Sequence, residues 1–282
     1  MNTLAIDIGG TKFSVAAFED ERMVRRESRS TDREGGRAWL VPQLDALLVE
    51  WKQEMSFDRC GIGFGGPVDF LRQTVHQSTH AGGWEGFSLT GHVAGIVSAP
   101  AIMDNDANVG ALGEGIYGAG KGSSPLFYMT ISTGIGGGIL MNGDLVRGAD
   151  GWAGEIGHST LDPNGPECLC GANGCFERMC CGLWMERDYG KSAQELLQDP
   201  AFVAGYVKLL ARGLKTCIMV LNPARIVIGG GISKAGDKLF VPLRAELARQ
   251  ITAWSGARQD VQPAALGDDS VLYGALRLAQ ML

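Results

Sequence analysis

One segment of the sequence concentrates side chains that can bind a metal ion. Between Glu155 and Glu177 lie one histidine and three cysteines among turn-forming glycines: His158, Cys168, Cys170 and Cys175. One imidazole nitrogen and three thiolates complete a tetrahedral shell, which is typical of a structural zinc site and leaves no position for a catalytic water. We therefore predict that these four residues bind Zn²⁺. The two glutamates are then available to hold another ligand.

The alternative is that the clustered cysteines are reduced buried residues or form disulfides. The chain has seven cysteines, which cannot all pair, and the cytosol keeps thiols reduced. We interpret Cys60, Cys180, Cys181 and Cys217 as small buried apolar side chains. Metal binding is favoured for the other three, although the spacing Cys-x-Cys-x4-Cys is unusual for zinc fingers.

Three glycine-rich turns could bind phosphate. They are Asp7–Lys12, Ser132–Gly138 and Gly229–Gly231. Turns without side chains let backbone N–H groups approach an anion, and neighbouring hydroxyls add donors. Asp7 could hold Mg²⁺ through water, since hard cations prefer carboxylates. Any one of them could be only a turn, but three together favour a site for nucleotide phosphates.

Acid–base chemistry is best assigned to the run Asp104-Asn105-Asp106. It precedes a helical pattern marked by Val109, Leu112 and Ile116. A helix N-terminus favours an ionised carboxylate, which suits a base that accepts a hydroxyl proton in phosphoryl transfer. The alternative is that these residues only cap the helix.

The elements that carry these motifs alternate between strands and helices. Residues 4–18 and 126–141 each predict a strand, a glycine turn and a second strand, which indicates an internal duplication. Further strands are expected at 60–64, 100–103 and 225–229, and helices at 38–55, 200–221 and 270–281, with another helix after Ser233. This alternation predicts an α/β protein.

Composition excludes several classes of protein. The 282 residues have a net charge of −6, which gives no electrostatic surface for nucleic acid. No apolar run approaches the ~20 residues that span a bilayer, and the N-terminus has no secretory signal. The basic cluster at Arg22–Arg29 is interpreted as a solvated strand or loop. We expect a cytoplasmic protein that binds neither nucleic acid nor membrane.

Taken together, the motifs resemble those of the ROK family (repressor, open reading frame, kinase). Asp7-x-Gly-Gly-Thr-Lys12 is similar to the family's first phosphate loop and Thr133-Gly-x-Gly-Gly-Gly138 to its second. Glu155-x-Gly-His158 and Cys168-x-Cys-Gly-x-x-Gly-Cys-x-Glu177 are similar to its zinc and sugar signature. The stretch Asp162–Pro166 resembles bacterial N-acetylmannosamine kinases and related glucokinases.

The resemblance implies an ATP-dependent kinase for the 6-hydroxyl of a hexose or N-acetylhexosamine, with an actin/hexokinase-like (ribonuclease H-like) fold of two lobes. The implied lobes are residues 1–103 with 270–282, and residues 104–269, with the active-site cleft between them. A homodimer is also implied. The alternatives are a sugar-sensing ROK regulator without kinase activity, or a ROK kinase for fructose or allose. A regulator is disfavoured because only six residues precede Asp7.

The resemblance also implies a role for each matched residue. Asp106 would be the catalytic base, and His158 would give one ring nitrogen to zinc and the other to the sugar. The implied sugar contacts are Gly65, Gly66, Asn105, Glu155, His158 and Glu177. The implied contacts to Mg²⁺-ATP are Asp7, Gly9, Gly10, Thr11, Lys12, Thr133, Gly134, Gly136, Gly230 and Gly231.

Three positions depart from the family pattern. Leu169 replaces a glycine within the metal loop, where its side chain is expected to point outward. Gly65-Gly66-Pro67 replaces a more usual Pro-Gly pair, and His80 stands where asparagine is common. A changed donor at His80 would alter which hydroxyl or N-acetyl group is recognised, which leaves the identity of the sugar open.

Overall fold

The computed structural model describes residues 1–32, 34–76 and 82–282. By its contacts the chain divides into two compact units. The N-terminal unit comprises Met1–Gly113, Arg147–Trp152 and Asp269–Leu282, and the C-terminal unit comprises Glu114–Val146 and Ala153–Asp268. Within the described residues, no helix is both long enough and apolar enough to cross a membrane.

The N-terminal unit is built on a five-stranded sheet in the order β3-β2-β1-β4-β7. Its strands are β1 (Asn2–Ile8), β2 (Lys12–Glu19), β3 (Arg22–Ser30), β4 (Arg59–Phe64) and β7 (Ala101–Asn105). β1, β4 and β7 are parallel, whereas β2 is antiparallel to both β1 and β3. The carboxyl ends of β1, β4 and β7 therefore meet at one edge of this sheet.

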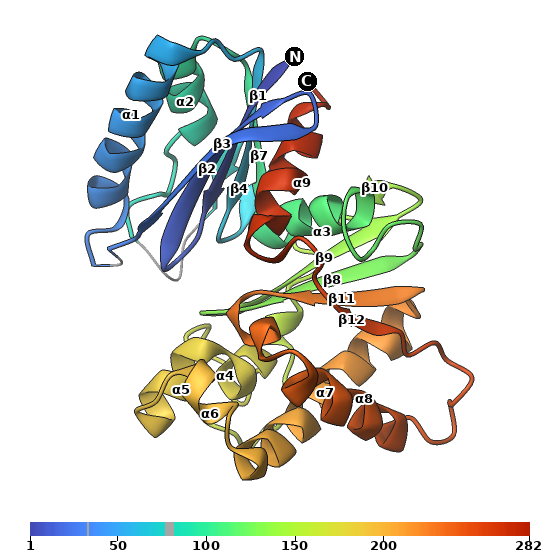
Figure 1. Cartoon of the computed structure of the whole chain (residues 1–282). Coiled ribbons are helices and arrows are strands. Elements are labelled where there is room, and N and C mark those ends of the chain that lie inside the picture. Colours follow the sequence, from blue (N-terminus) through green and yellow to red (C-terminus); the bar gives the residue numbers. More distant parts are fainter. Residues whose placement is uncertain (33, 77–81) are drawn as a thin grey trace. The chain divides into compact units, whose positions relative to one another are not determined.

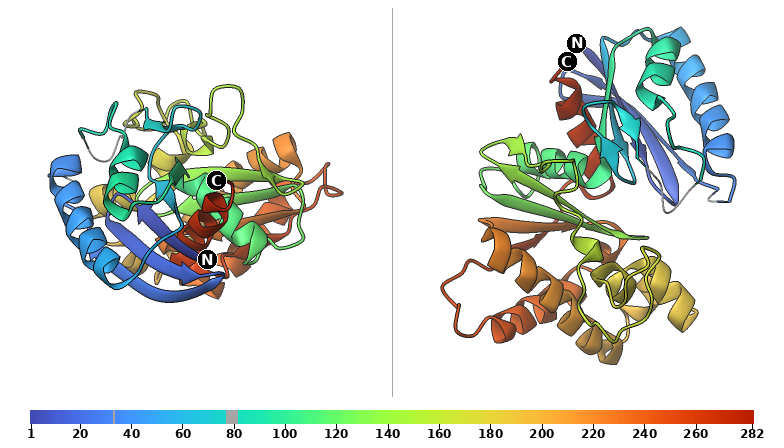
Figure 2. Two further views of the ribbon diagram at one scale, coloured as in Figure 1. Left: turned by 90° about the horizontal axis from the view of Figure 1, so that it is seen from above. Right: turned by 180° about the vertical axis from the view of Figure 1, so that it is seen from behind.

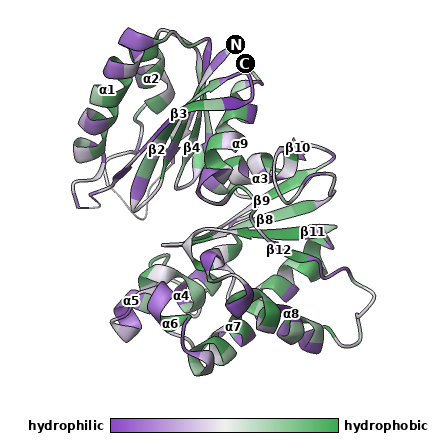
Figure 3. Cartoon of the chain, in the orientation of Figure 1, coloured by the Kyte–Doolittle hydropathy of each residue, from purple (hydrophilic) through white to green (hydrophobic). Residues whose placement is uncertain are grey.

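Helices cover both faces of this sheet (Figures 1 and 2). α1 (Gly36–Glu54) and α2 (Leu89–Val97) share a hydrophobic core with one face, and α9 (Ser270–Ala279) packs on the other. α9 approaches very closely, since a Cβ at Gly61 of β4 would lie 1.9 Å from the carbonyl oxygen of Ala275. The covered strands are mostly hydrophobic, whereas α1 mixes hydrophilic and hydrophobic residues (Figure 3). Strands that are buried on both faces are expected to be hydrophobic along most of their length.

The C-terminal unit repeats the sheet in the order β10-β9-β8-β11-β12. Its strands are β8 (Leu126–Ile131), β9 (Ile135–Met141), β10 (Asp144–Leu145), β11 (Arg225–Gly229) and β12 (Val261–Pro263). β8, β11 and β12 are parallel and β9 is antiparallel to both β8 and β10. The same pattern of directions as in the first sheet confirms the predicted duplication of the hairpin unit.

The longest helices of the C-terminal unit are α7 (Pro200–Leu221) and α8 (Asp237–Gln250). Asp199 caps α7 by accepting a 2.8 Å hydrogen bond from the N–H of Ala201, and Pro200 is its first residue. This start matches the prediction from the pair Asp199-Pro200. The short helices α4 (Phe176–Cys180), α5 (Gly182–Tyr189) and α6 (Ala193–Leu196) follow the cysteine cluster.

The division between the units differs from the predicted one. The predicted boundaries followed residue 103 and preceded residue 270, whereas the contacts divide the chain after Gly113, inside α3 (Asp106–Ile116), and before Asp269. β7 extends to Asn105 and pairs with β4, and the first turns of α3 pack on α9. There a Cβ at Gly113 would lie 2.0 Å from the carbonyl oxygen of Ser270. The segment Arg147–Trp152 also joins the N-terminal unit, which the sequence did not predict.

Candidate active site

The predicted catalytic run lies where β7 ends and α3 begins. Asn105 caps α3, because its Oδ1 accepts hydrogen bonds from the N–H groups of Ala107 (2.9 Å) and Asn108 (3.3 Å). Its Nδ2 donates to the carbonyl oxygen of Gly66 at 3.0 Å. The capping role considered as the alternative is therefore present. Capping uses Oδ1, and the contact with Gly66 uses one of the two hydrogens of Nδ2. The second hydrogen leaves the predicted sugar contact of Asn105 compatible with capping.

Asp106 is the first residue of α3, where the helix dipole favours an ionised carboxylate. The loop after β4 approaches it closely. The N–H of Gly65 donates to the carbonyl oxygen of Ile8 at 2.7 Å, and a Cβ at Gly65 would lie 3.5 Å from Oδ2 of Asp106. The structure therefore brings together the predicted base and the predicted sugar loop, Gly65-Gly66.

The first phosphate turn lies at the same edge of the sheet. Asp7 is buried at the end of β1 and is in register with Gly63 of β4. The turn to β2 is closed by a 3.0 Å hydrogen bond from the N–H of Gly9 to the carbonyl oxygen of Lys12, and the tip residue Thr11 is exposed. In open α/β sheets, ligands bind outside the carboxyl ends of the strands. Asp7, Gly65 and Asp106 all lie at or just beyond those ends.

The second phosphate turn lies between β8 and β9 and is tied to the predicted sugar-binding residue Glu177. Oε2 of Glu177 accepts a 2.8 Å hydrogen bond from the N–H of Ile135, directly after the turn. Thr133, Gly134 and Gly136 occupy the turn and the start of β9. Glu177 is only 6% exposed. One carboxylate oxygen therefore supports the turn, and the other is compatible with the predicted sugar contact.

Glycines allow the segment that carries Glu155 and His158 to lie directly on β9. A Cβ at Gly157 would lie 2.3 Å from the carbonyl oxygen of Ile135, and one at Gly137 would lie 2.6 Å from that of Gly154. Burial raises the pKa of Glu155 above its ordinary value, and the negative charge of Glu177 raises it further while His158 lowers it. Within this unit, the three sequence-predicted sugar ligands thus influence one another.

The third glycine turn follows β11 and lies beside the end of β8. Gly230 has a positive φ of 82°, and a Cβ there would lie 2.4 Å from the carbonyl oxygen of Ile131. A Cβ at Gly231 would lie 3.9 Å from Oγ of Ser132. The second and third predicted nucleotide turns are therefore neighbours in the C-terminal unit.

The predicted metal ligands converge. The ligand atoms of His158, Cys168, Cys170 and Cys175 all lie within 4.8 Å of one another. Nδ1 of His158 faces the sulfurs at 4.0 Å from Cys168, and the sulfurs of Cys170 and Cys175 are 3.5 Å apart. Zinc–ligand bonds of about 2.0–2.3 Å in a tetrahedron separate neighbouring ligands by roughly 3.5–3.8 Å. This donor set and its spacing fit Zn²⁺.

The other four cysteines are buried, as the sequence predicts. All seven thiols are free, and Cys60, Cys180, Cys181 and Cys217 are buried. Leu169 is 48% exposed, as expected for a side chain that points away from the metal loop. The prediction for His80 lies outside the described residues.

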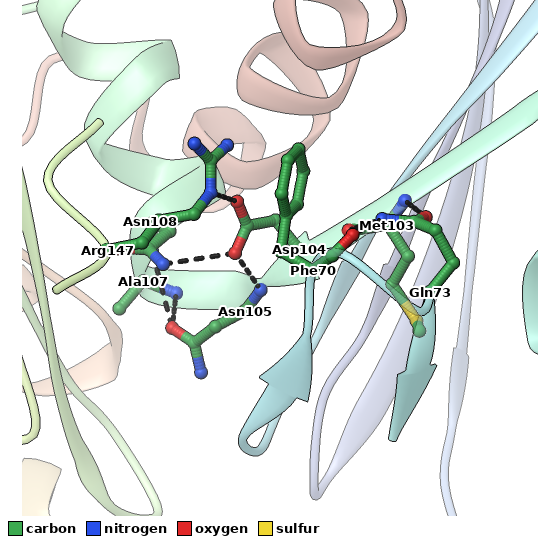
Figure 4. A network of polar contacts seen from close by, with 8 residues as sticks. All are labelled: Phe70, Gln73, Met103, Asp104, Asn105, Ala107, Asn108 and Arg147. Carbon is green, nitrogen blue, oxygen red and sulfur yellow. Dashed lines mark hydrogen bonds and ion pairs between the residues drawn. The ribbon is translucent and has the colours of Figure 1, made fainter. Parts of the chain in front are cut away.

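Sequence reasoning did not identify Arg147, which is paired with Asp104 (Figure 4). Nε of Arg147 donates to Oδ2 of the buried Asp104 at 2.7 Å, and the guanidinium lies 3.6 Å from the ring centroid of Phe70. The sequence groups Asp104 with the acid–base candidates. Its adjacency to Asp106 marked it, but no sequence motif marked Arg147.

The comparisons with known proteins agree with this arrangement. The model of the ROK family matches residues 3–281. The chain is 31% identical to a glucokinase of Thermotoga maritima, over 98% of this chain and 96% of that protein. It is 30% identical to an N-acetylmannosamine kinase of Yersinia pestis, over 96% of each. It also superposes on a ROK family glucokinase from Streptomyces griseus, solved with glucose and AMPPNP, with a TM-score of 0.87, 26% identity and full coverage of both chains. The chain belongs to the ROK family.

Proposed function

We propose that the chain is an ATP-dependent sugar kinase that phosphorylates the 6-hydroxyl of a hexose or N-acetylhexosamine. The observation that carries this proposal is the gathering of Asp106, Asn105 and the Gly65-Gly66 loop at the carboxyl ends of parallel strands. Similarity to a glucokinase and to an N-acetylmannosamine kinase supports the proposed substrate class.

The chemistry assigns each group a role. The carboxylate of Asp106 accepts the proton of the sugar hydroxyl as that oxygen bonds to the γ-phosphorus of ATP, and the bond from phosphorus to the bridging oxygen of ADP breaks. Asn105, Glu155, His158 and Glu177 hold the other hydroxyls. The turns at Gly9–Lys12 and Thr133–Gly136 offer backbone N–H groups to the phosphates, and Gly230 and Gly231 lie under the nucleoside. Mg²⁺ bound with ATP neutralises phosphate charge, and Asp7 would hold it through water.

His158, Cys168, Cys170 and Cys175 would bind a structural Zn²⁺. A complete shell of protein ligands leaves no open position on the metal, so its contribution is to fix the loop between Glu155 and Glu177. The support is the convergence of the four ligand atoms. The homodimer implied by the ROK resemblance stays a prediction, which sedimentation velocity tests.

A coupled ADP-release assay tests the function. Purified protein is supplied with Mg²⁺-ATP and, separately, glucose, mannose, N-acetylmannosamine, N-acetylglucosamine, fructose or allose. We expect sugar-dependent ADP release with at least one of them, and a 6-phosphate by NMR of the product. A parallel arm replaces ATP with polyphosphate. If no sugar promotes phosphate transfer from either donor, the kinase proposal is wrong and a sugar-sensing role is favoured.

A further inference from the structure

Arg147 comes from a part of the chain that sequence reasoning did not connect with catalysis. It follows β10 and precedes the segment that leads to Glu155, yet the run Arg147–Trp152 packs with the N-terminal unit. Trp152, at the other end of this run, stacks on His76 with ring centroids 5.4 Å apart. The run is therefore held to the N-terminal unit by side chains at both ends.

The partner of Arg147 organises the junction between β7 and α3. Oδ1 of Asp104 accepts hydrogen bonds from the N–H of Asn105 (2.8 Å) and from Nδ2 of Asn108 (3.0 Å), and Oδ2 accepts from Arg147. Both oxygens of a side chain that is only 2% exposed are thus engaged within the protein. With both oxygens engaged, Asp104 is not placed to act as a base. It binds Asn105 and Asn108, which lie on either side of the proposed base Asp106 in the sequence.

The same junction is held at the strand. β7 is the edge strand of its sheet, and the side chain of Gln73 binds the backbone of Met103 on its open side. Oε1 of Gln73 accepts from the N–H of Met103 at 2.6 Å, and Nε2 donates to the carbonyl oxygen of Met103 at 3.1 Å. Nε2 also donates to the carbonyl oxygen of Phe70, whose ring packs on Arg147. Figure 4 shows these contacts as one network that ends at the first turn of α3.

We propose that Arg147 is a positioning residue for phosphoryl transfer. Its guanidinium neutralises the buried Asp104 carboxylate and so fixes the first turn of α3, which aims the carboxylate of Asp106. This inference rests on the proposed kinase function. Without Arg147, a buried carboxylate lacks its cation, a state that is strongly unfavourable. Asp104 then takes up a proton or turns towards water, and in either case its contacts to Asn105 and Asn108 weaken.

The alternative is that Arg147 contacts the substrate itself. Its Nη2 is buried and has no hydrogen-bond partner in the described part of the chain. The two roles predict different kinetics. Displacing the base lowers kcat while sugar and ATP still bind, whereas losing a direct contact weakens binding of the substrate that Arg147 touches.

Four variants test the proposal: R147M, R147K, D104N and the double variant R147M/D104N, with R72M as the control. Arg72 forms a salt bridge with Asp69 in the same unit but is 81% exposed. Steady-state kcat and KM for sugar and ATP are measured at a temperature where circular dichroism shows each variant folded. We expect R147M to lower kcat by about 10–100-fold, since small misplacements of reacting groups have such effects, with both KM values within about threefold.

The double variant gives the decisive comparison. Replacing Asp104 by asparagine removes the unpaired charge, so R147M/D104N should recover at least about fivefold of the kcat lost in R147M, and R147K should fall between R147M and the wild type. A wild-type kcat in R147M, or a raised KM that the second substitution does not correct, would overturn the inference. If R147M does not fold, R147K and the double variant decide in the same way. A lowered kcat at constant KM would then support the inference, and a wild-type kcat would overturn it. An inactive wild type would instead refute the kinase proposal.

Discussion

Nε of Arg147 donates a 2.7 Å hydrogen bond to Oδ2 of Asp104, a residue 43 positions earlier in the chain. Arg147 belongs to the segment that leads to Glu155, and Asp104 lies two positions before Asp106. The pair therefore links these two parts of the chain. A buried charge pair of this kind is costly to break from one side, because the partner left behind keeps its charge without water around it.

Asp104→Ala is therefore expected to destabilise the protein. Arg147 is partly exposed, at 20% of its side chain, so we expect a loss of about 2–4 kcal/mol, at or below the usual range for a fully buried pair. The apparent free energy of unfolding in urea measures it. Glu19→Ala, which removes an exposed i,i+3 pair with Arg22, should cost less than about 0.5 kcal/mol. Equal losses in the two variants would contradict this account.

Asp106→Asn should abolish turnover without preventing sugar binding. A general base contributes about 10²–10⁴-fold to rate, and asparagine keeps the size of the side chain at the start of α3. Kinetics and calorimetric titration with the preferred sugar measure the two effects. The exposed Asp144→Asn is the matched control. A kcat within about threefold of wild type in Asp106→Asn would remove this residue from the mechanism.

Metal analysis should find about one zinc per chain. Because the four ligands lie within an 18-residue segment, from His158 to Cys175, removing the metal should loosen this loop and lower the melting temperature. A chelator should lower the wild-type melting temperature by several degrees. It should cause no further change in Cys170→Ser, which already lacks a ligand. Protein purified without zinc, with a melting temperature insensitive to chelator, would refute the site.

The pH dependence of stability should reveal Glu155. Since burial raises its pKa above 4.5, the folded state keeps the proton to higher pH than the unfolded state. The resulting stabilisation is fully present below pH 4.5 and is lost as the pH rises through the folded pKa. Relative to Glu155→Gln, the wild type should lose stability in thermal melts as the pH rises above 4.5. A constant difference across this range would show that the carboxyl is not desolvated.

Two glycine-to-alanine substitutions in helices should have opposite signs. At Gly274 of α9 a Cβ would lie 1.7 Å from the carbonyl oxygen of Val109, so alanine should cost about 1–3 kcal/mol by overpacking. At Gly95 of α2 no atom lies within 4 Å of the added Cβ, so alanine should stabilise by about 0.5–1 kcal/mol. Urea unfolding of both variants checks the prediction. Stabilisation by Gly274→Ala would show that α3 and α9 do not approach so closely.

The sequence predicts most of the framework because its signals are local. The two hairpins, α7 with its cap at Asp199, and β11 with its glycine turn follow from periodicity and turn chemistry, and all are present. The convergence of His158 with three cysteines followed from the type and density of ligands. The helix expected around Cys180 is present as α4, whereas α2, α5, α6 and β12 were not predicted, since their apolar patterns are short.

The supporting contacts of the candidate catalytic residues could not be predicted in the same way. Arg147 has no local motif, and its role depends on a chain path that brings it back to the N-terminal unit. Asp104 was grouped with acid–base candidates because composition cannot distinguish a carboxylate with both oxygens engaged from one that faces a substrate. The capping hydrogen bonds of Asn105 were foreseen, but its donation to Gly66 depends on how β4 and β7 pair.

The orientation of the His158 ring has a consequence for the sugar contact that is proposed for it. Nδ1 is the atom that faces the sulfurs, so a zinc ion bound there holds the imidazole in a single tautomer, with its hydrogen on Nε2. In that form Nε2 can only donate. The histidine then recognises a lone pair on its ligand and cannot take up a proton from a sugar hydroxyl, which leaves proton acceptance to the carboxylates.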